Sequence, residues 1–276
     1  MAAVEGGAPA PGVSGPADGP NGAGSLLALA GLGKRFGGLE ALADVALEVP
    51  PRQVTAIIGP NGAGKTTLFN LVTGDLKPTA GTVHFKGVDV TGWEAHRICA
   101  LGMARTFQSP RLFENLNVIE NVIAARFVRT RSSLVESLLG VGRSRAEHAR
   151  SVAMAEELLR SVEIWHHRGH MPKELPYGDR RRLEIARALA TEPELILMDE
   201  PTAGMIPSEA AELMALIRTL VDDGRTVLLI EHNMNVVMAI SDSIMVLNFG
   251  RKIAEGPPAQ VQQDAKVLEA YLGVEA

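Results

Sequence analysis

Residues 57–69 read IIGPNGAGKTTLF, and this stretch decides the fold. An apolar run leads into a glycine-rich loop, and a helical pattern begins at its lysine. The sequence matches G-x-x-x-x-G-K-[ST] in the strand–loop–helix context that a phosphate-binding loop requires. Glycines let backbone N–H groups curve around phosphate oxygens, and the helix N-terminus adds a partial positive charge. The stretch therefore predicts a phosphate-binding loop.

The loop offers several groups that can act on a bound phosphate chain. Lys65 is expected to reach the β- and γ-phosphates, and the Thr66 hydroxyl is expected to ligate Mg²⁺. An ordinary glycine-rich turn is the alternative, but it explains neither the lysine nor the threonine. The candidate phosphate-contacting residues are Gly59, Pro60, Asn61, Gly62, Ala63, Gly64, Lys65, Thr66 and Thr67.

Short apolar runs and longer helical patterns alternate on both sides of this loop. Nearly continuous apolar runs of this length are typical of strands that are buried on both faces. The predicted strands cover residues 53–58, 82–85, 194–198, 226–230 and 243–247. The predicted helices cover residues 65–74, 118–128, 146–162, 181–190 and 208–224, the last with Ser208 as its N-cap. This alternation predicts an α/β fold with a largely parallel sheet.

The chain divides by composition and pattern into a tail and one large domain. Residues 1–24 are rich in Gly, Pro, Ala and Ser, so we expect a disordered tail. Residues 25–276 form the predicted domain, whose core comprises 25–108 and 187–276. Only helical patterns occur between about 109 and 186, which predicts an inserted helical subdomain.

The composition limits the functions and cellular locations that the chain can have. The 276 residues carry a formal net charge of −5, which argues against nucleic-acid binding by bulk electrostatics. The single cysteine, Cys99, cannot form an internal disulfide, which favours a reducing compartment. No apolar run approaches the roughly 18 residues that a membrane-spanning helix needs. Since no secretory signal is evident either, we expect a protein that stays in the cytoplasm.

Two carboxylates end the apolar run ELILMDEP at residues 194–201. Ligands of parallel sheets lie at the carboxyl ends of the strands, so Asp199 and Glu200 are expected to face the phosphate loop. Asp199 suits coordination of Mg²⁺, and Glu200 suits a general base that activates water. A solvated acidic pair is the alternative, and it would be the better interpretation without a phosphate loop nearby.

Several motifs that occur in order resemble the ATP-binding subunits of ABC transporters. Besides the phosphate loop, these are RTFQ (105–108), LPYGDRRRLEIARAL (175–189), LILMDEP (195–201) and LLIEHNM (228–234). Further stretches resemble the branched-chain amino acid uptake group. They are KRFGGLEAL (34–42), GMARTFQSPRLFENLNVIENV (102–122), EHNMNVVMAISD (231–242), AEGPPAQV (254–261) and VLEAYLG (267–273). The resemblance covers about residue 25 to the C-terminus.

The resemblance implies a fold and roles for single residues. The fold would be a P-loop NTPase core of RecA-like type, with a small antiparallel β subdomain and the inserted helices. Gln108 would contact Mg²⁺ and the attacking water, and His232 would bind the γ-phosphate and fix the base–water geometry. Phe36 would stack on adenine, although core packing is a rival role for such an aromatic residue. Taken alone, a glutamine and a histidine after strands would not predict a site.

The resemblance also implies a loop that acts on a partner's nucleotide. In the family, two subunits enclose two ATP molecules, and the Leu-Ser-Gly-Gly-Gln signature of one completes the site of the other. The corresponding residues of this chain are Leu175, Pro176, Tyr177, Gly178 and Asp179. Pro176 offers neither the hydroxyl of serine nor an N–H group. Asp179 places a carboxylate near the expected phosphate or caps the helix.

A second departure from the family pattern lies in PTAGMIP, residues 201–207, where Ile206 replaces the usual Asp or Asn. Together with Pro176 and Asp179, it suggests the hypothesis that the trans site completed by this chain is weak. Neutral variation on a tolerant loop is an equal alternative. The arginines at 180–182 could indicate nucleic acid, but one basic helix turn in an acidic chain favours ion pairing instead.

The sequence as a whole predicts a Mg²⁺-dependent ATPase that drives an importer for branched-chain amino acids or related small amphiphilic solutes. The implied partners are a second ATP-binding subunit, with a heterodimer expected, two transmembrane permease subunits and, indirectly, a solute-binding protein. The expected location is the cytoplasmic face of the membrane. The alternatives are an ABC ATPase in another role, such as an exporter or a soluble translation or repair factor, and an ATP-binding regulatory subunit with weak turnover.

Overall fold

The computed structural model describes residues 24–129 and 142–272. The predicted disordered tail, apart from residue 24, lies outside the described residues. Among the described residues, no helix is long and apolar enough to cross a membrane.

The centre of the molecule is a six-stranded, mostly parallel sheet with the strand order β10-β9-β3-β8-β7-β6. Only β10 runs antiparallel to its neighbour, β9. The strands are β3 (Val54–Ile58), β6 (Met103–Arg105), β7 (Leu195–Asp199), β8 (Thr226–Ile230), β9 (Ser243–Asn248) and β10 (Arg251–Gly256). Four of the five predicted strands form in this sheet at nearly the predicted bounds.

The fifth predicted strand belongs to a separate antiparallel sheet, so the expectation that it is buried on both faces was wrong. Residues 82–85 lie in β4 (Ala80–Phe85), which pairs antiparallel with β1 (Leu27–Phe36). The sheet has the order β2-β1-β4-β5, with β2 at Leu39–Val49 and β5 at Val88–Asp89. Within β4, Val83 and Phe85 are buried while His84 is partly exposed, as in a sheet with one face on the core.

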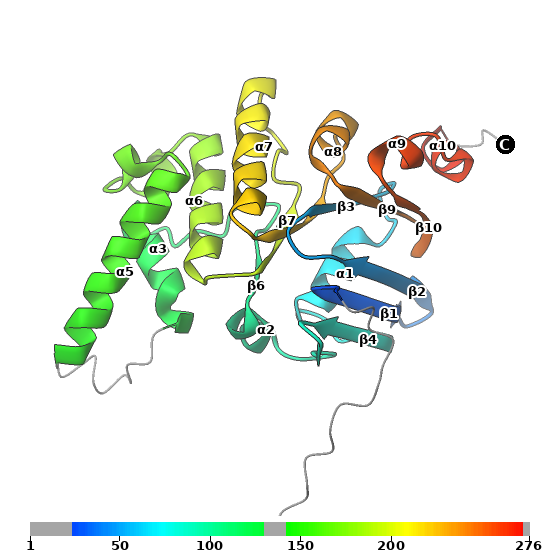
Figure 1. The fold of residues 1–276 in the computed structure, drawn as a ribbon, viewed down its shortest axis with the longest axis horizontal. Coiled ribbons are helices and arrows are strands. Elements are labelled where there is room, and N and C mark those ends of the chain that lie inside the picture. Colours follow the sequence, from blue (N-terminus) through cyan, green and yellow to red (C-terminus); the bar gives the residue numbers. More distant parts are fainter. Residues whose placement is uncertain (1–23, 130–141, 273–276) are drawn as a thin grey trace, which may run out of the picture.

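Helices cover both faces of the central sheet (Figure 1). Helix α1 (Lys65–Val72) packs in the core between the two sheets. On the opposite face lie α7 (Pro207–Asp222) and α8 (Met234–Ile240). The remaining helices are α2 (Ala95–Leu101), α3 (Val118–Ala125), α5 (Gly142–Ser161), α6 (Tyr177–Ala190), α9 (Pro258–Val261) and α10 (Ala265–Leu272). Three 3₁₀ turns complete the described part: η1 (Arg126–Arg129), η2 (Trp165–His167) and η3 (Pro172–Glu174).

Strand β7 shows why continuous apolar runs form this sheet. Leu195 and Leu197 point into the core shared with α1 and the antiparallel sheet. Ile196 and Met198 point into the core shared with α6 and α7. Because both faces of the strand are covered, every position is apolar up to Asp199 at its carboxyl end.

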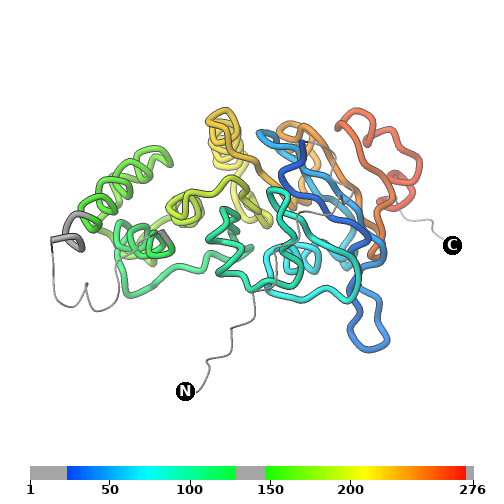
Figure 2. Tube along the Cα trace, turned by 60° about the horizontal axis from the view of Figure 1, so that its bottom comes forward, coloured from blue at the N-terminus to red at the C-terminus, as the bar shows by residue number. Residues whose placement is uncertain are grey.

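Helices α3, α5 and α6 gather at one end of the molecule, and the C-terminal helices α9 and α10 lie at the other (Figures 1 and 2). The predicted N-cap of α7 was wrong by two residues. Ile206 precedes the helix, Pro207 occupies its first position, and Glu209 Oε2 accepts a 3.1 Å hydrogen bond from the Ile206 N–H. Proline is favoured at this first position because its missing N–H would be unpaired there anyway.

Candidate active site

The glycine-rich loop runs from the end of β3 to the start of α1. Gly59 has a φ of 151°, and a Cβ built there would lie 2.1 Å from the carbonyl oxygen of Leu247. Gly64 has a φ of 101°, and its Cβ would lie 2.8 Å from the carbonyl oxygen of Ala41. Both positions therefore need glycine, because β9 and β2 approach the loop too closely for a side chain.

Lys65 is the first residue of α1, and its side chain turns back into the loop. Its Nζ donates hydrogen bonds to the carbonyl oxygens of Gly59 at 2.7 Å and Pro60 at 2.9 Å. Burial lowers the pKa of Lys65, while the carboxylates of Glu200 and Asp199 oppose that shift. The lysine and the two acids are thus close enough to influence one another's charge.

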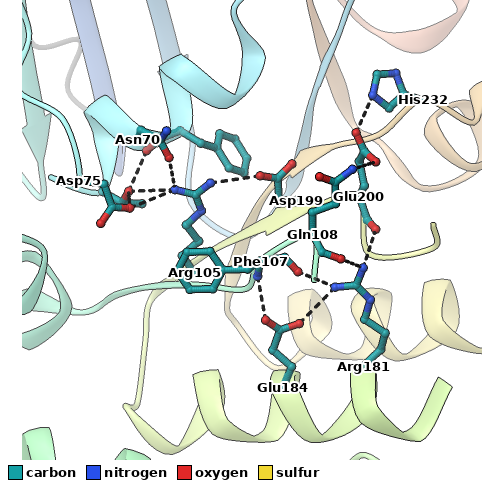
Figure 3. A network of polar contacts seen from close by, with 12 residues as sticks. Asn70, Asp75, Arg105, Phe107, Gln108, Arg181, Glu184, Asp199, Glu200 and His232 are labelled. Atoms are coloured by element: carbon teal, nitrogen blue, oxygen red, sulfur yellow. Dashed lines mark hydrogen bonds and ion pairs between the residues drawn. The ribbon is translucent and has the colours of Figure 1, made fainter. Parts of the chain in front are cut away.

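Asp199 ends β7 as a buried carboxylate held by an arginine. Arg105 Nη2, at the end of β6, lies 3.1 Å from Asp199 Oδ2. The same guanidinium donates to Asn70 Oδ1 at 2.6 Å and to Asp75 Oδ2 at 3.1 Å (Figure 3). Burial raises the pKa of Asp199, and Arg105 partly offsets that shift. Arg105 therefore joins β6, α1 and β7 around one acid.

Glu200 lies between two of the predicted site residues. Gln108 Nε2 donates to Glu200 Oε2 at 2.7 Å, and His232 Nε2 lies 2.6 Å from Glu200 Oε1 (Figure 3). The backbone of Glu200 has a φ of 47°, in the left-handed region that costs a non-glycine residue about 1–2 kcal/mol. Its N–H donates to the carbonyl oxygen of Ile230 at 2.9 Å, which holds this turn on β8. Strain of this kind clusters at functional sites.

A buried acid that the sequence reasoning did not single out positions the loop of His232. Glu231 Oε2 accepts hydrogen bonds from the backbone N–H groups of His232 at 2.9 Å and Asn233 at 3.3 Å. Its Oε1 accepts one from the N–H of Thr202 at 3.1 Å and another from the Thr202 hydroxyl. Glu231 thereby ties the turn after β8 to the turn after β7.

Helix α6 clamps the segment that carries Gln108. Arg181 is only 2% exposed and donates to the carbonyl oxygens of Phe107 and Gln108. Glu184, one turn along, accepts from the Phe107 N–H at 2.8 Å and lies 3.3 Å from Arg181 (Figure 3). Burial raises the pKa of Glu184, against the opposing hydrogen bond from Phe107 and the charge of Arg181. The helix of the predicted signature loop is thus bonded directly to the Gln108 segment.

The predicted signature loop is largely the first turn of α6 and not a free loop. Leu175 is buried, Pro176 precedes the helix, and Tyr177, Gly178 and Asp179 begin it. Asp179 does not cap the helix, because proline at the N-cap position has no N–H to offer. Its Oδ2 lies 3.2 Å from His167 Nε2 instead.

Two other residues from the sequence analysis are exposed. Phe36 ends β1 with 46% of its surface accessible, and Lys34 Nζ lies 5.1 Å from the centre of its ring. The rival role of Phe36 as a core residue does not fit this exposure. Ile206 is exposed before α7, whereas Arg181 and Arg182 are buried and ion-paired, so they form no exposed basic patch.

The expected Mg²⁺ ligands line one cleft. Thr66, Gln108 and Asp199 lie on its wall together with Asn70 and other residues. Hydroxyl, amide and carboxylate oxygens are the donors that Mg²⁺ prefers. Since Gln108 uses Nε2 on Glu200, its Oε1 is the atom that would serve as a ligand. Burial disfavours a charged Asp199, and a cation beside it would relieve that cost, so these residues fit the ion.

Sequence reasoning assigned no role in this site to Arg105, to Glu231 or to the Arg181–Glu184 pair, although it favoured ion pairing for the arginines at 180–182. Arg105 ends the strand MAR, Glu231 follows the apolar run TVLLI directly, and Arg181 and Glu184 lie on the buried face of α6. A charged residue at a position that should be buried is a signal for a partner nearby. The identity of that partner depends on the tertiary arrangement.

Comparison with known proteins shows the family of the chain. Residues 42–203 match the model of the ABC transporter family, and residues 251–276 match that of the branched-chain amino acid ATP-binding cassette transporter. The high-affinity branched-chain amino acid transport ATP-binding protein LivG of Escherichia coli K12 is 43% identical over 249 residues, which cover 90% of this chain and 98% of that protein.

Solved structures extend the agreement to the fold. The ADP conformation of an ATP-binding cassette from an ABC transporter superposes with a TM-score of 0.79 at 35% identity, over 90% of this chain and 99% of that one. A dimeric cassette bound to ADP and Pi gives a TM-score of 0.72 at 26% identity, over 84% and 98% of the two chains. The chain therefore belongs to the ABC transporter family, as an ABC ATPase of its branched-chain amino acid group.

Proposed function

We propose that this chain is the ATP-hydrolysing subunit of an importer for branched-chain amino acids or related small amphiphilic solutes. The observation that carries the proposal is Glu200, held between Gln108 and His232 beside the phosphate loop. The family of the chain and its similarity to LivG supply the transport role.

The loop between β3 and α1 would bind the triphosphate through its backbone N–H groups and Lys65. On binding, Lys65 Nζ would exchange the carbonyl oxygens of Gly59 and Pro60 for phosphate oxygens. Phe36 would stack its exposed ring on adenine. When bound at Thr66, Gln108 and Asp199, Mg²⁺ neutralises phosphate charge.

Glu200 would act as the general base. Its carboxylate accepts a proton as water attacks the γ-phosphorus; the new P–O bond forms and the bond to the β–γ bridging oxygen breaks, with its electron pair leaving on ADP. Gln108 and His232 would keep the carboxylate in one orientation and contact the water and the γ-phosphate. Positioning of this kind supplies most of the catalysis in phosphoryl transfer.

Replacement of the base tests the proposal. In Glu200→Gln, ATP turnover should fall by about 100-fold or more, because the amide cannot take the proton, while ATP binding persists. Glu194→Gln is the matched control, since Glu194 stands at the opposite end of β7 on the surface. Equal turnover in Glu200→Gln and the control would instead favour the alternative of a regulatory subunit, which the departures at Asp179 and Ile206 support.

The site is proposed to be shared between two ATP-binding subunits. The first turn of α6, after Leu175, would face the partner's nucleotide with its backbone N–H groups and helix dipole. Pro176 supplies no hydroxyl there, so the site that this chain completes in trans would be the weaker one. The dimeric relative supports pairing of such cassettes, and the partner of this chain is proposed to be a different subunit.

The permease is proposed to dock beside the Gln108 segment. A cleft of about 500 Å³ lies there, lined by Cys99 of α2, Phe107, Phe113, Val128 and Arg187 among others. Phe113 is 49% exposed. An element of the permease in this cleft would contact the Phe107–Gln108 segment, which Arg181 and Glu184 hold. ATP binding at Gln108 would thus be coupled to movement of the permease. Attachment there would place the chain on the cytoplasmic face of the membrane.

The chain is proposed to consist of a core, an inserted subdomain and a tail. Residues 25–108 and 187–276 would form the nucleotide-binding core, residues 109–186 the helical subdomain, and residues 1–24 a disordered tail. Helix α6 contacts the Gln108 segment directly. A movement of the helical subdomain would therefore change the position of Gln108 in the site.

A further inference from the structure

A cluster of histidines and one carboxylate lies outside the nucleotide cleft, where η2 meets the first turn of α6. His167 Nε2 is 3.2 Å from Asp179 Oδ2. Ligating atoms of His166, His167 and Asp179 all lie within 4.8 Å of one another. We propose that these three residues bind a divalent transition-metal ion of the Zn²⁺ class.

The separations between the donor atoms suit such an ion. Zn²⁺ binds imidazole nitrogen and carboxylate oxygen at about 2.0–2.2 Å in tetrahedral geometry. Two ligands of one tetrahedral ion are therefore about 3.4 Å apart. The His167–Asp179 separation is close to this value, and rotation of the exposed His166 side chain would bring the third donor in.

The donors are not engaged by competing cations. Arg180 donates to the carbonyl oxygens of Leu175 and Lys173, at 3.0 and 2.9 Å. Arg182 pairs with Glu163 and Glu212. Within residues 24–129 and 142–272, His167 is the ion-pair partner found for Asp179.

His167 also has a nitrogen that lacks a protein partner. Its Nδ1 is buried and makes no hydrogen bond within the described residues. A buried polar atom without a partner costs about 1–3 kcal/mol. Nε2 is the ring nitrogen that faces Asp179, so it is the atom that would ligate the ion, while Nδ1 stays buried and unpaired among the described residues.

The scaffold holds the cluster in place without the ion. The backbone N–H groups of Val118 and Ile119, in the first turn of α3, donate to the carbonyl oxygens of His170 and Arg168 at 3.0 and 3.1 Å. Ile164, just before η2, is fully buried in the core. A backbone fixed in this way loses little freedom on binding, which favours affinity.

The donor set selects the kind of ion. Two imidazoles and one carboxylate suit Zn²⁺, Co²⁺, Ni²⁺ or Cu²⁺, whereas Mg²⁺ prefers oxygen donors only. The exposure of His166 leaves room for water as a fourth ligand. The inference does not rest on the proposed function, since it concerns residues outside the P-loop cleft and binding alone.

Titration of the full-length, chelator-treated protein with Zn²⁺ and Co²⁺ tests this site without nucleotide. Calorimetry should give one ion per chain, and Co²⁺ should acquire the absorption of a tetrahedral complex. His167→Gln and Asp179→Asn should each weaken binding at least tenfold. His148→Gln, which removes an exposed histidine of α5 outside the cluster, should bind as the wild type does.

A second measurement needs no variant. Zn²⁺ should protect His166 and His167 of the wild-type chain from modification by diethyl pyrocarbonate, as mapped by mass spectrometry, and leave His148 reactive. Absence of saturable binding, equal affinity in the cluster variants and the control, or unprotected His166 and His167 would each overturn the proposal.

Discussion

Arg105 stabilises the site through Asp199, although it is not itself proposed to contact the nucleotide. It and Asp199 are both at least nine-tenths buried, and the guanidinium also contacts Asn70 and Asp75. Removing one partner of a buried ion pair leaves the other charge uncompensated, which typically costs 3–5 kcal/mol. The stability of the nucleotide core therefore depends on a residue that is not proposed to touch the nucleotide.

In Arg105→Ala, the free energy of unfolding should fall by about 3 kcal/mol in urea titrations without nucleotide. Arg218→Ala is the control, because Arg218 also pairs with two carboxylates, Asp222 and Asp242, but its side chain is 47% exposed. Exposed pairs contribute about 1 kcal/mol or less. Equal losses in the two variants would show that burial does not set the strength of the Arg105 contacts.

At the residue scale, the sequence predicted those residues whose neighbours in the chain form a motif. Lys65, Asp199 and Glu200 each follow or precede a recognisable strand, and the structure places their charges within reach of one another. The direct contact of Gln108 and His232 with Glu200 could not be derived, because three segments must first assemble. The orientation of Asp179 toward His167 likewise depends on η2, which no sequence pattern predicts.

At the scale of elements, α6 connects the candidate signature turn to the Gln108 segment through Glu184. Burial raises the pKa of this carboxyl group in the folded chain. The folded state then binds the Glu184 proton more tightly than the unfolded state does. This contribution to stability is complete below the ordinary pKa of glutamate and is lost as pH rises through the raised pKa.

Stability measurements between pH 4.5 and 7 should show this loss. As pH rises across that range, the wild type should lose unfolding free energy relative to Glu184→Gln, whose side chain carries no charge at any pH. Other titrating groups are common to both proteins and cancel in the difference. A difference that stays constant, or one that moves in favour of the wild type, would contradict the raised pKa.

The first turn of α6 makes a separate prediction about turnover in trans. The double variant Pro176→Ser/Asp179→Gln restores a hydroxyl and an amide at the positions where the family signature carries them. In a complex with the partner subunit, with Mg²⁺ supplied and a Zn²⁺-selective chelator present, the site that this turn is proposed to complete should hydrolyse ATP faster by severalfold. Unchanged turnover would identify both departures as neutral.

Element types followed from periodicity, whereas their placement did not. The five strand patterns and five helical patterns all appear in the structure at nearly the predicted positions. Residues 82–85 were placed in the wrong sheet because the four residues TVHF are too few to separate one buried face from two. Strands β1, β2 and β10 were not predicted, because bulges and polar residues interrupt their alternation of apolar and polar residues.

At the scale of the whole molecule, the account requires an attachment point for the membrane subunits. Phe113 is exposed beside the cleft near the Gln108 segment, with the Arg187 guanidinium 4.6 Å from its ring centre. In Phe113→Ser, recovery of the permease in co-purification from mild detergent should fall severalfold, while the melting temperature stays near that of the wild type. Phe249→Ser is the control, because this exposed aromatic lies near the phosphate loop instead.

Uptake into proteoliposomes tests whether ATP hydrolysis at Glu200 drives solute import. These would contain this chain with its co-purified membrane subunits and partner, supplied with the solute-binding protein. The account predicts ATP-dependent accumulation of leucine, isoleucine, valine or a chemically similar solute, reduced at least tenfold by Glu200→Gln in this chain. Full uptake with Glu200→Gln, or a chain that hydrolyses ATP but never associates with a permease, would contradict it.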